Sequence, residues 1–399
     1  MPAQASTIKH HTFQGYMGTH NSGTVALFST RFVPYSQTFI YDEVRAHERY
    51  EIDVFCKERL NTERFPYDEE RVYCPPRWAK KIYENVAYWP SFDRQIQRGN
   101  YDLIHAHFGT TAVYALPYVW RHDLPFVVTF WGNDVGALIG AQRYEPTRWR
   151  YVALAPKIMA ASDLMLGVSE ELCAWVRRFS GRPDVVKPYR HGVDLSKFHP
   201  TSVERAVPEV VMVGRFTEKK GHRYALRAVS KALQAGCELH FSLIGSGELE
   251  GECRAYVREH GLEDHVTFHG VLSHDETADR LARADIALVP SVVARDHDRE
   301  GSPTVVKEAS ASGVPVIGTY HAGIPETVDD GKTGFLVPER NVPALTDRLI
   351  TLLSNDDLRE AFGRAAREKM EREFDLFEQV GSLERHYDQV LRNASVNEK

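Results

Sequence analysis

The sequence predicts an α/β protein made of two doubly wound domains, each with a parallel sheet covered by helices. Its 399 residues exceed the length of one ordinary core, about 100–200 residues, so two domains are expected. Short apolar runs recur along the chain, and a helical pattern follows each of them, as in parallel sheets. A polar, proline-containing stretch over residues 198–208 divides these runs into two sets, and we interpret it as the linker between the domains.

Each half of the chain contains five apolar runs that we expect to form strands. In the first half they are Thr24–Ser29, Ile52–Phe55, Leu103–Ala106, Phe126–Thr129 and Leu164–Val168. In the second half they are Glu209–Val213, Leu239–Ile244, Val266–His269, Ile286–Pro290 and Val314–Thr319. Doubly wound domains bind ligands at the carboxyl ends of their strands, so two facing domains predict a cleft there. The predicted boundaries are a disordered N-terminus over 1–22, a first domain over 23–200, a second domain over 207–373 and a C-terminal helix over 374–399.

The composition argues against several classes of protein. Hydrophobic residues make up 43% of the chain and charged residues 26%, which is ordinary for a globular protein. A net charge of −6 argues against a nucleic-acid-binding protein. The five cysteines include no C-x-x-C pair, so we expect neither a disulfide framework nor a cysteine zinc site. Residues 1–22 lack an apolar signal core, and no run reaches the about 18 apolar residues of a membrane span, so we expect a soluble, cytoplasmic protein.

Residues 299–319 predict a helix start that can hold an anion. Ser302 is suited to the N-cap and Pro303 to the first helical position, and we expect the helix to stop near Gly313. The unpaired N–H groups of a helix start attract anions. Glu300 and Glu308 would repel a phosphate, so if both face the cleft they should accept hydrogen bonds from hydroxyl groups of a ligand instead. The alternative, two solvated glutamates beside a helix start, stays open on this stretch alone.

Residues 211–221 predict a second phosphate-binding element, a strand followed by a turn with two glycines and three cations. Gly214 allows a close approach of the backbone to a phosphate, Arg215 offers a bidentate fork, and Lys220 offers a point charge. The loop Gly245–Gly251 imitates a dinucleotide fingerprint, but its third glycine comes one residue late. We therefore favour a loop near a nucleotide over an NAD site.

Together these stretches resemble the retaining glycosyltransferases of family 4, which have the GT-B fold of two facing Rossmann-like domains. The family's Gly-Arg-(four residues)-Lys-Gly motif matches Gly214, Arg215, Lys220 and Gly221, and its Glu-(seven residues)-Glu motif matches Glu300 and Glu308. The first half follows the family order in the stretches 103–109, 129–134, 167–171 and 191–198. The loop 32–40 is similar to that of colanic-acid-type and other exopolysaccharide glycosyltransferases.

The resemblance implies a donor site in the second domain. Arg215 and Lys220 would bind the donor diphosphate, Glu300 would hold the transferred sugar, and these three residues would be the catalytic ones. Glu308 would hold the ribose or nearby hydroxyls, and residues from His269 to Leu272 would bracket the base. The implied donor-binding residues are Gly214, Arg215, Lys220, Gly245, His269, Leu272, Glu300, Gly301, Ser302, Pro303, Thr304 and Glu308. The final helix would cross back onto the first domain, and the transfer would retain the anomeric configuration.

The resemblance also implies an acceptor side in the first domain. Many family members have histidine at the position of Trp131, so a histidine role is not expected there. Trp131 either stacks on a sugar or only packs, and both interpretations stay open. His107 and Asp134 are then the better candidates in the first domain, although a loop histidine with a hydrogen bond is an alternative for His107. The expected acceptor-side residues are Ser36, Gln37, His107, Trp131 and Asp134.

Three further patterns are of the kind that can mark a metal or a membrane site. Asp296-His-Asp298 has the D-x-D pattern, but it lies in a polar loop and is interpreted as solvated. His105 and His107 form a pair with no evident third ligand. We therefore expect no metal and no other cofactor. The basic and aromatic segment Arg77–Phe92 is either a helix packed on the first sheet or a contact to a membrane that carries a lipid-linked acceptor.

We therefore predict a retaining enzyme that moves a hexosyl group from a nucleotide-diphosphate sugar, UDP-sugars being favoured, to a glycan, lipid-linked or small-molecule acceptor. Polysaccharide or glycoconjugate biosynthesis would be its setting, in the cytoplasm or at the inner face of the membrane. The alternatives are a nucleotide-sugar 2-epimerase of related fold and a non-catalytic carbohydrate-binding protein.

Overall fold

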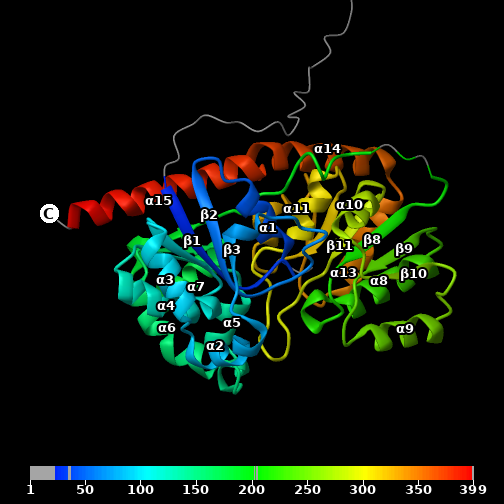
Figure 1. The fold of residues 1–399 in the computed structure, drawn as a ribbon. Helices are drawn as coiled ribbons and strands as arrows, with labels where there is room; N and C mark the ends of the chain where they lie inside the picture. The colour runs from blue at the N-terminus through cyan, green and yellow to red at the C-terminus, as the bar shows by residue number, and fades with distance from the viewer. Residues whose placement is uncertain (1–22, 35–36, 202, 204, 398–399) are drawn as a thin grey trace, which may run out of the picture.

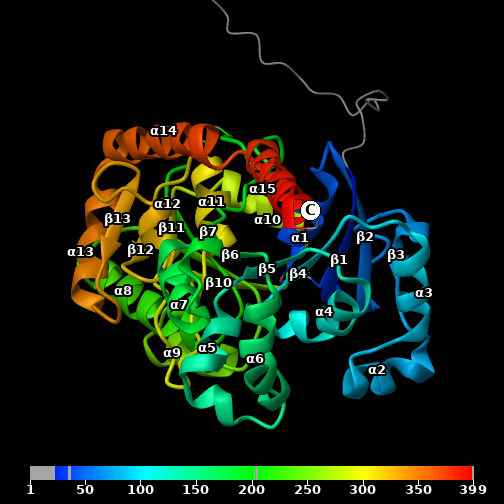
Figure 2. The same cartoon turned by 90° about the vertical axis from the view of Figure 1, so that its left-hand side faces the viewer.

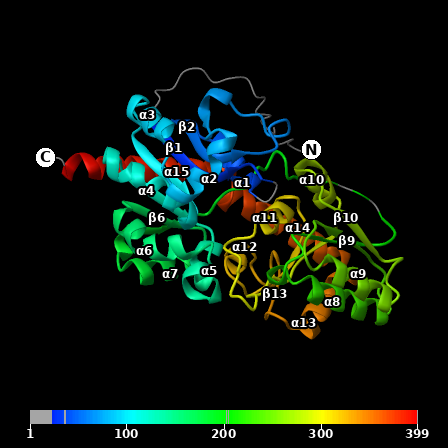
Figure 3. The ribbon, with the colours of Figure 1, turned by 60° about the horizontal axis from the view of Figure 1, so that its bottom comes forward.

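The computed structural model describes residues 23–34, 37–201, 203 and 205–397, and within them the chain forms two α/β domains side by side (Figures 1 and 3). The N-terminal prediction for 1–22 lies outside these residues. The first domain has a seven-stranded parallel sheet in the order β3-β2-β1-β4-β5-β6-β7, and the second a six-stranded parallel sheet in the order β10-β9-β8-β11-β12-β13. The predicted fold class is confirmed.

The first domain contains the following strands and helices: β1 Gly23–Phe32, α1 Thr38–Arg45, β2 Tyr50–Arg59, β3 Val72–Tyr73, α2 Lys80–Val86, α3 Pro90–Arg98, β4 Leu103–His107, α4 Gly109–His122, β5 Phe126–Phe130, α5 Asn133–Ile139, α6 Trp149–Ala161, β6 Leu164–Gly167, α7 Glu170–Ser180 and β7 Val186–Pro188. The second domain contains β8 Glu209–Val213, α8 His222–Gln234, β9 His240–Ile244, α9 Glu250–Glu259, β10 Val266–Gly270, α10 His274–Ala282, β11 Ile286–Val289, α11 Thr304–Ala311, β12 Val316–Thr319, α12 Ile324–Thr327, β13 Gly334–Val337 and α13 Val342–Leu353. The chain ends with α14 Asp356–Glu373 and α15 Leu376–Asn397.

Ten strands lie where the apolar runs predict them, and three more lie at sheet edges. The central strands are buried on both faces, which explains why they appear as continuous apolar runs. The additional strands β3, β7 and β13 are each at the edge of a sheet and have two to four residues. The two and three residues of β3 and β7 leave only a weak pattern in the sequence, whereas β13 is as long as the predicted strands β6, β11 and β12 and its length does not explain why it was missed.

The C-terminal segment returns to the first domain, as predicted, but it consists of two helices. Figure 1 shows α14 and α15 end to end over both domains. The break lies at Phe374 and Asp375, and the carboxylate of Asp375 accepts hydrogen bonds from the backbone N–H groups of Phe377 and Glu378. Asp375 therefore starts a new helix, which begins at Leu376 instead of the predicted residue 374. Figure 2 shows α15 running on over the first sheet.

Glu384 fixes α15 to the first domain. Its buried carboxylate accepts hydrogen bonds from the backbone N–H of Glu48 at 3.0 Å and of Arg49 at 3.0 Å, and it contacts His47 Nδ1 at 3.2 Å and Arg49 Nε at 3.1 Å. Burial alone would raise the pKa of Glu384, but the hydrogen bonds from His47 and Arg49 outweigh burial and lower the pKa to about 2. The carboxylate is therefore ionised and bound from several sides.

Replacement of Glu384 by alanine is expected to lower the free energy of unfolding by about 3 kcal/mol, because it leaves buried donors without their acceptor. Urea unfolding measures this value. Glu371→Ala is the control, because Glu371 is half exposed and its ion pair is with Arg367 on the same helix, so its loss should cost less than about 1 kcal/mol. The pKa of Glu384 is lowered from 4.5, so its contribution is present above that pH and is lost as the pH falls toward about 2. An equal loss of unfolding free energy in the two variants would contradict the role of Glu384 in fixing α15 to the first domain.

Candidate active site

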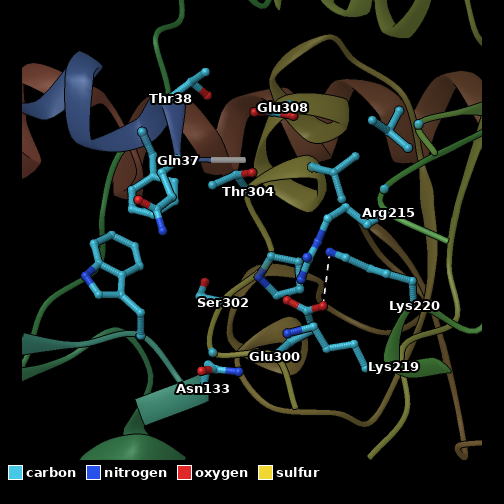
Figure 4. A pocket seen from close by; sticks show the side chains of 18 of the residues that line it. Gln37, Thr38, Asn133, Arg215, Lys219, Lys220, Glu300, Ser302, Thr304 and Glu308 are labelled. Carbon is cyan, nitrogen blue, oxygen red and sulfur yellow. Dashed lines mark ion pairs between the residues drawn. The ribbon is translucent and has the colours of Figure 1, made fainter. Parts of the chain in front are cut away.

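The two domains face each other across a cleft of about 860 Å³. Residues at the carboxyl ends of β1, β4 and β5 line it from the first domain. Residues that follow β8, β9 and β10, and the start of α11, line it from the second domain. Figure 4 shows Gln37 and Thr38 on one wall and Arg215 and Lys220 on the other. The predicted cleft at the strand ends is therefore present.

Most of the predicted site residues line this cleft. Those on the donor side that do so are Gly214, Arg215, Lys220, Gly245, Leu272, Glu300, Gly301, Ser302, Pro303, Thr304 and Glu308. On the acceptor side, Gln37 and Trp131 line it. His269, His107 and Asp134 are not among the lining residues. Ser36 lies outside the described residues.

The glycine turns after β8 and β9 form one edge of the donor wall. Gly245 has φ +129°, and a Cβ atom there would collide with the carbonyl oxygen of Gly214. The two loops can therefore approach each other only without a side chain at position 245. Arg215 is the residue after Gly214, and its side chain faces the cleft (Figure 4). Within the described part of the chain its guanidinium has no ion pair. This cation is available to a ligand.

Glu300 is an ionised carboxylate on the donor wall. Its Oε1 lies 3.0 Å from Nζ of Lys220, the ion pair drawn in Figure 4. Burial would raise the pKa of Glu300, but the charges of Lys220 and Lys219 outweigh it and lower the pKa to about 2. The backbone N–H of Glu300 donates to Nε2 of His321 at 3.2 Å, and Nδ1 of that ring contacts Glu339 Oε1 at 2.6 Å. Glu300 is thus held in place, with its charge suited to accept hydrogen bonds.

The helix start next to Glu300 differs from the prediction by one position. Pro303, in extended conformation with ψ 122°, is the N-cap, and α11 begins at Thr304. Ser302 does not cap the helix, because its Oγ accepts a hydrogen bond from Nζ of Lys307 at 2.8 Å. The first turn still faces the cleft, since Thr304 and Glu308 both line it. Nε2 of His274 lies 3.7 Å from Oε1 of Glu308.

The predicted base-binding segment is only partly exposed to the cleft. Leu272 and its neighbour Val271 line it. His269 instead points into its own sheet, where its Nε2 lies 2.9 Å from Oγ of Ser242. A strand residue next to a cleft alternates between the two faces of the sheet, and the sequence did not indicate which face His269 takes.

Trp131 lines the cleft and also packs inside the first domain. It is 8% exposed, and its ring centroid lies 4.1 Å from that of Phe39 and 5.1 Å from that of His191. Its indole Nε1 donates to Nδ1 of His107 at 3.2 Å, and Nε2 of His107 lies 2.9 Å from Oε1 of Glu43. His107 is fully buried, and the hydrogen bond from Trp131 connects it to a residue that lines the cleft. His107 is therefore hydrogen-bonded, as the alternative interpretation has it, but it is the last residue of β4 and does not lie in a loop.

Asp134 organises the loop that carries Trp131. The carboxylate is buried and accepts hydrogen bonds from the backbone N–H groups of Gly109, Trp131, Gly132 and Val135. Burial raises the pKa of Asp134, and these four hydrogen bonds counteract the rise. The aspartate thus joins the loops after β4 and β5 instead of facing the cleft.

The groups considered as metal ligands have partners of their own. Asp298 lies 3.1 Å from Nζ of Lys219, and it accepts from Nδ2 of Asn133 at 3.0 Å across the domain boundary. The missing third group beside His105 and His107 is Glu43, which lies more than 60 residues earlier in the chain. Both ring nitrogens of His105 are hydrogen-bonded, to Tyr387 and Thr129, and all three groups are buried.

Sequence reasoning missed several residues of the cleft and its floor. Thr38, Phe39 and Asn133 line it next to predicted residues, and their types carry no distinctive pattern. Lys307 and His191 meet beneath Ser302, with Nζ of Lys307 at 3.1 and 3.0 Å from the two ring nitrogens of His191. Lys307 lies within the Glu300–Glu308 stretch, so a lysine among the small and apolar residues of α11 was the available signal.

The chain resembles known glycosyltransferases in sequence. Residues 37–197 match the family Glycosyltransferase Family 4, and residues 197–369 match Glycosyl transferases group 1. Over 281 residues it is 34% identical to WcaL of Escherichia coli K12, named as a colanic acid biosynthesis glycosyltransferase, covering 68% of this chain and 67% of that protein. It is 33% identical to the amylovoran biosynthesis glycosyltransferase AmsK of Erwinia amylovora over 225 residues, which are 55% of this chain and 54% of AmsK.

Solved structures share the fold at low sequence identity. Sucrose-phosphate synthase from Thermosynechococcus elongatus superposes with a TM-score of 0.75 at 20% identity, over 93% of this chain and all of that chain. HepE of Anabaena, solved with UDP and glucose, gives a TM-score of 0.73 at 16% identity, over 92% of this chain and all of that chain. Since the WcaL match spans two thirds of both chains and the two domains form the predicted cleft, this protein belongs to the family 4 glycosyltransferases of GT-B fold.

Proposed function

We propose that the enzyme transfers a hexosyl group with retention from a nucleotide-diphosphate sugar to a glycan, lipid-linked or small-molecule acceptor. The observation that carries the proposal is the grouping of Arg215, Lys220 and Glu300 at the start of α11, within a cleft between two domains. Two cations suit a diphosphate, and an ionised carboxylate suits sugar hydroxyls. The names of WcaL and AmsK support a place in polysaccharide or glycoconjugate biosynthesis.

The distribution of charge supports a mechanism without a protein nucleophile. Among the described lining residues, the carboxylates are Glu300 and Glu308, and both belong to the donor wall. A glycosidase-type double displacement needs carboxyl groups on opposite sides of the sugar, about 5 Å apart. Glu300 is in addition held by Lys220. We infer that Arg215 and Lys220 stabilise the charge that grows on the departing diphosphate, while Glu300 holds the sugar.

We propose a UDP-sugar as donor and no divalent metal. HepE, which shares the fold, was solved with UDP and with UDP-glucose. Arg215 and Lys220 can neutralise a diphosphate without a metal ion. In the D-x-D stretch, the carboxylate of Asp298 already pairs with Lys219, which argues against its use as a metal ligand.

Calorimetric titration with UDP, GDP and ADP is expected to show binding of at least one of them, UDP being favoured. A chelator should change neither the affinity in this titration nor the turnover in an activity assay. If none binds, the donor assignment fails. If activity disappears with a chelator and returns with manganese, the metal-free proposal fails. Turnover of the nucleotide sugar in the absence of any acceptor would favour the 2-epimerase, and binding of sugar without nucleotide would favour a non-catalytic carbohydrate-binding protein.

Variants separate the roles of the donor residues. Arg215→Ala and Lys220→Ala should each lower kcat by the equivalent of about 2–4 kcal/mol of barrier, because they act on charge that is largest in the transition state. Glu300→Gln should lower kcat while affinity for the nucleoside diphosphate does not fall, since it removes a negative charge beside Lys220. Glu308→Gln should act chiefly on KM. Hydroxyls far from the breaking bond are bound equally well in the ground state and in the transition state.

Steady-state kinetics and nucleotide titration measure these effects. Arg223→Ala is the control, because Arg223 lies on α8 of the same domain and pairs with the exposed Glu252. Its kcat should stay within about twofold of the wild type, as expected for a surface ion pair. A Glu300→Gln variant with normal kcat and lost nucleotide binding would contradict the assignment of Glu300 to the sugar.

The enzyme is proposed to act in the cytoplasm, at the inner face of a membrane. The segment Arg77–Phe92 does pack on the first domain, because Ala79 and Tyr83 are buried. Its outward face is apolar at three positions one turn apart, where Trp78 is 72%, Ile82 48% and Val86 58% exposed. Exposed Arg77 and Lys81 lie next to this stripe. An apolar stripe flanked by cations fits an anionic bilayer. No helix within the described residues is long and apolar enough to cross a membrane.

The stripe is expected to bind vesicles that contain anionic lipid, and much less to vesicles of neutral lipid. The double variant Trp78→Ser, Ile82→Ser should have a partition coefficient for these vesicles at least about tenfold lower than the wild type. The reason is that burying one apolar side chain contributes about 1.5–3 kcal/mol. Phe377→Ser on α15 is the control, with a similarly exposed ring at 49%. Sedimentation with vesicles measures the bound fraction. Equal binding of the double variant and the wild type would contradict a membrane role for this face.

A further inference from the structure

Lys307 is a buried cation at the floor of the cleft. It lies on α11, is 1% exposed, and places Nζ 2.8 Å from Oγ of Ser302. The same Nζ is 3.1 Å from Nδ1 and 3.0 Å from Nε2 of His191, so it lies against the ring and not along one nitrogen lone pair. The ring of Phe374 completes the surroundings at 5.5 Å. Lys307 thus joins the donor domain to a histidine of the first domain.

The charge of Lys307 has no close counter-ion. Within the described residues, no carboxylate lies within ion-pair distance of its Nζ. The charged groups that act on it from the surrounding elements are Glu308 of α11, Glu326 of α12 and Arg190 next to His191. The Glu326 carboxylate accepts a hydrogen bond from the backbone N–H of Glu170. Burial, with a smaller effect of Arg190, lowers the pKa of Lys307 to about 7 against the opposing effect of Glu326 and Glu308.

Ser302 links Lys307 to the substrate cleft directly, and His191 links it to residues that line the cleft. Ser302 lines it, and because its oxygen accepts a hydrogen bond from Lys307, its own proton is free to point toward a ligand. His191 packs against Trp131 and Phe39, which line the opposite wall. Burial, together with the nearby Lys307, lowers the pKa of His191 well below its ordinary value, so the ring is neutral. Lys307 is therefore a buried cation in contact with Ser302, which separates it from the cleft.

We propose that Lys307 is a positioning residue that directs the Ser302 hydroxyl toward the donor diphosphate and takes up a proton when this anion enters the cleft. The inference rests on the proposed function, which supplies the diphosphate. A buried ammonium without a counter-ion is costly, and a negatively charged ligand one hydroxyl away reduces that cost. The bound enzyme consequently holds the proton more tightly than the free enzyme does.

The direction of the pH dependence follows from this coupling. In the free enzyme Lys307 loses its proton as the pH rises through about 7. In the complex its pKa is higher, so between the two values binding takes up a proton. Affinity for a nucleoside diphosphate is then greatest below about pH 7 and falls by up to tenfold per pH unit above it. Above about pH 7.5 the ligand's own titration does not contribute to this pH dependence. A terminal phosphate has a pKa of about 6 and is already ionised at that pH.

Calorimetry in two buffers with different heats of ionisation counts the protons taken up. With UDP, or whichever of UDP, GDP and ADP binds, we expect uptake of about half to one proton at a pH of about 8 in the wild type. Lys307→Met should bind without proton uptake and with an affinity that does not change between about pH 7.5 and 9. Lys369→Met is the matched control, because Lys369 is also a buried lysine of the second half of the chain but pairs with Asp329 at 2.6 Å. This variant should retain the uptake.

The outcomes separate this inference from the proposed function. If the wild type binds none of the three nucleotides, the donor assignment itself fails, and the role of Lys307 with it. If the wild type binds a nucleotide without proton uptake, or if Lys307→Met retains the full uptake, the donor assignment stands and the role of Lys307 is wrong. If Lys307→Met does not fold, the wild-type measurement still tests the role, because binding without proton uptake contradicts it. A purely structural lysine would change the melting temperature on replacement but leave the proton count unchanged.

Discussion

The site depends on a close backbone contact between the two domains. A Cβ atom on Gly301 would collide with the carbonyl oxygen of Trp131, and a Cβ on Gly132 would lie 2.8 Å from the backbone nitrogen of Gly301. Two glycines therefore allow the loop after β5 to touch the loop before α11. Because the touching atoms include the backbone of Trp131 and of Glu300, this contact places Trp131 on one wall and Glu300 on the other. A larger residue at either position would separate the walls and with them the donor and acceptor sides.

Electrostatics then give the two walls different tasks. The donor wall contains Glu300 with Lys220, and the neighbouring Lys219 reaches Asp298, which in turn holds Asn133 of the first domain. The carboxylate of Glu300 remains ionised although it is buried, because two lysines compensate its charge. On the acceptor wall, the buried acids Glu43 and Asp134 are turned inward, where they position His107 and the loop of Trp131. Both lining carboxylates, Glu300 and Glu308, thus lie on the wall of the second domain, and the wall of the first domain combines aromatic and hydroxyl groups with Arg31 and Arg148.

The helix α15 keeps the two domains in one unit. It starts where Asp375 pairs with Val193, close to the end of the first domain, and it is fixed further along by Glu384 and by the contact of Tyr387 with His105. The chain thus passes between the domains twice, once through residues 198–208 and once through the break at Phe374. Movement of one domain against the other would bend these two segments while each sheet stays intact.

The sequence by itself determined the elements whose signal is local. Central parallel strands are buried on both faces and appear as apolar runs, and the motifs around Arg215 and Glu300 are contiguous, so the fold class and most of the donor wall could be predicted. Only the tertiary structure decided which side chains meet across long separations. Lys307 and His191 are 116 residues apart, and Glu384 reaches Arg49 across 335. It also decided that His107 and Asp134 point inward, because the face a residue takes depends on what packs against it, which no local pattern records.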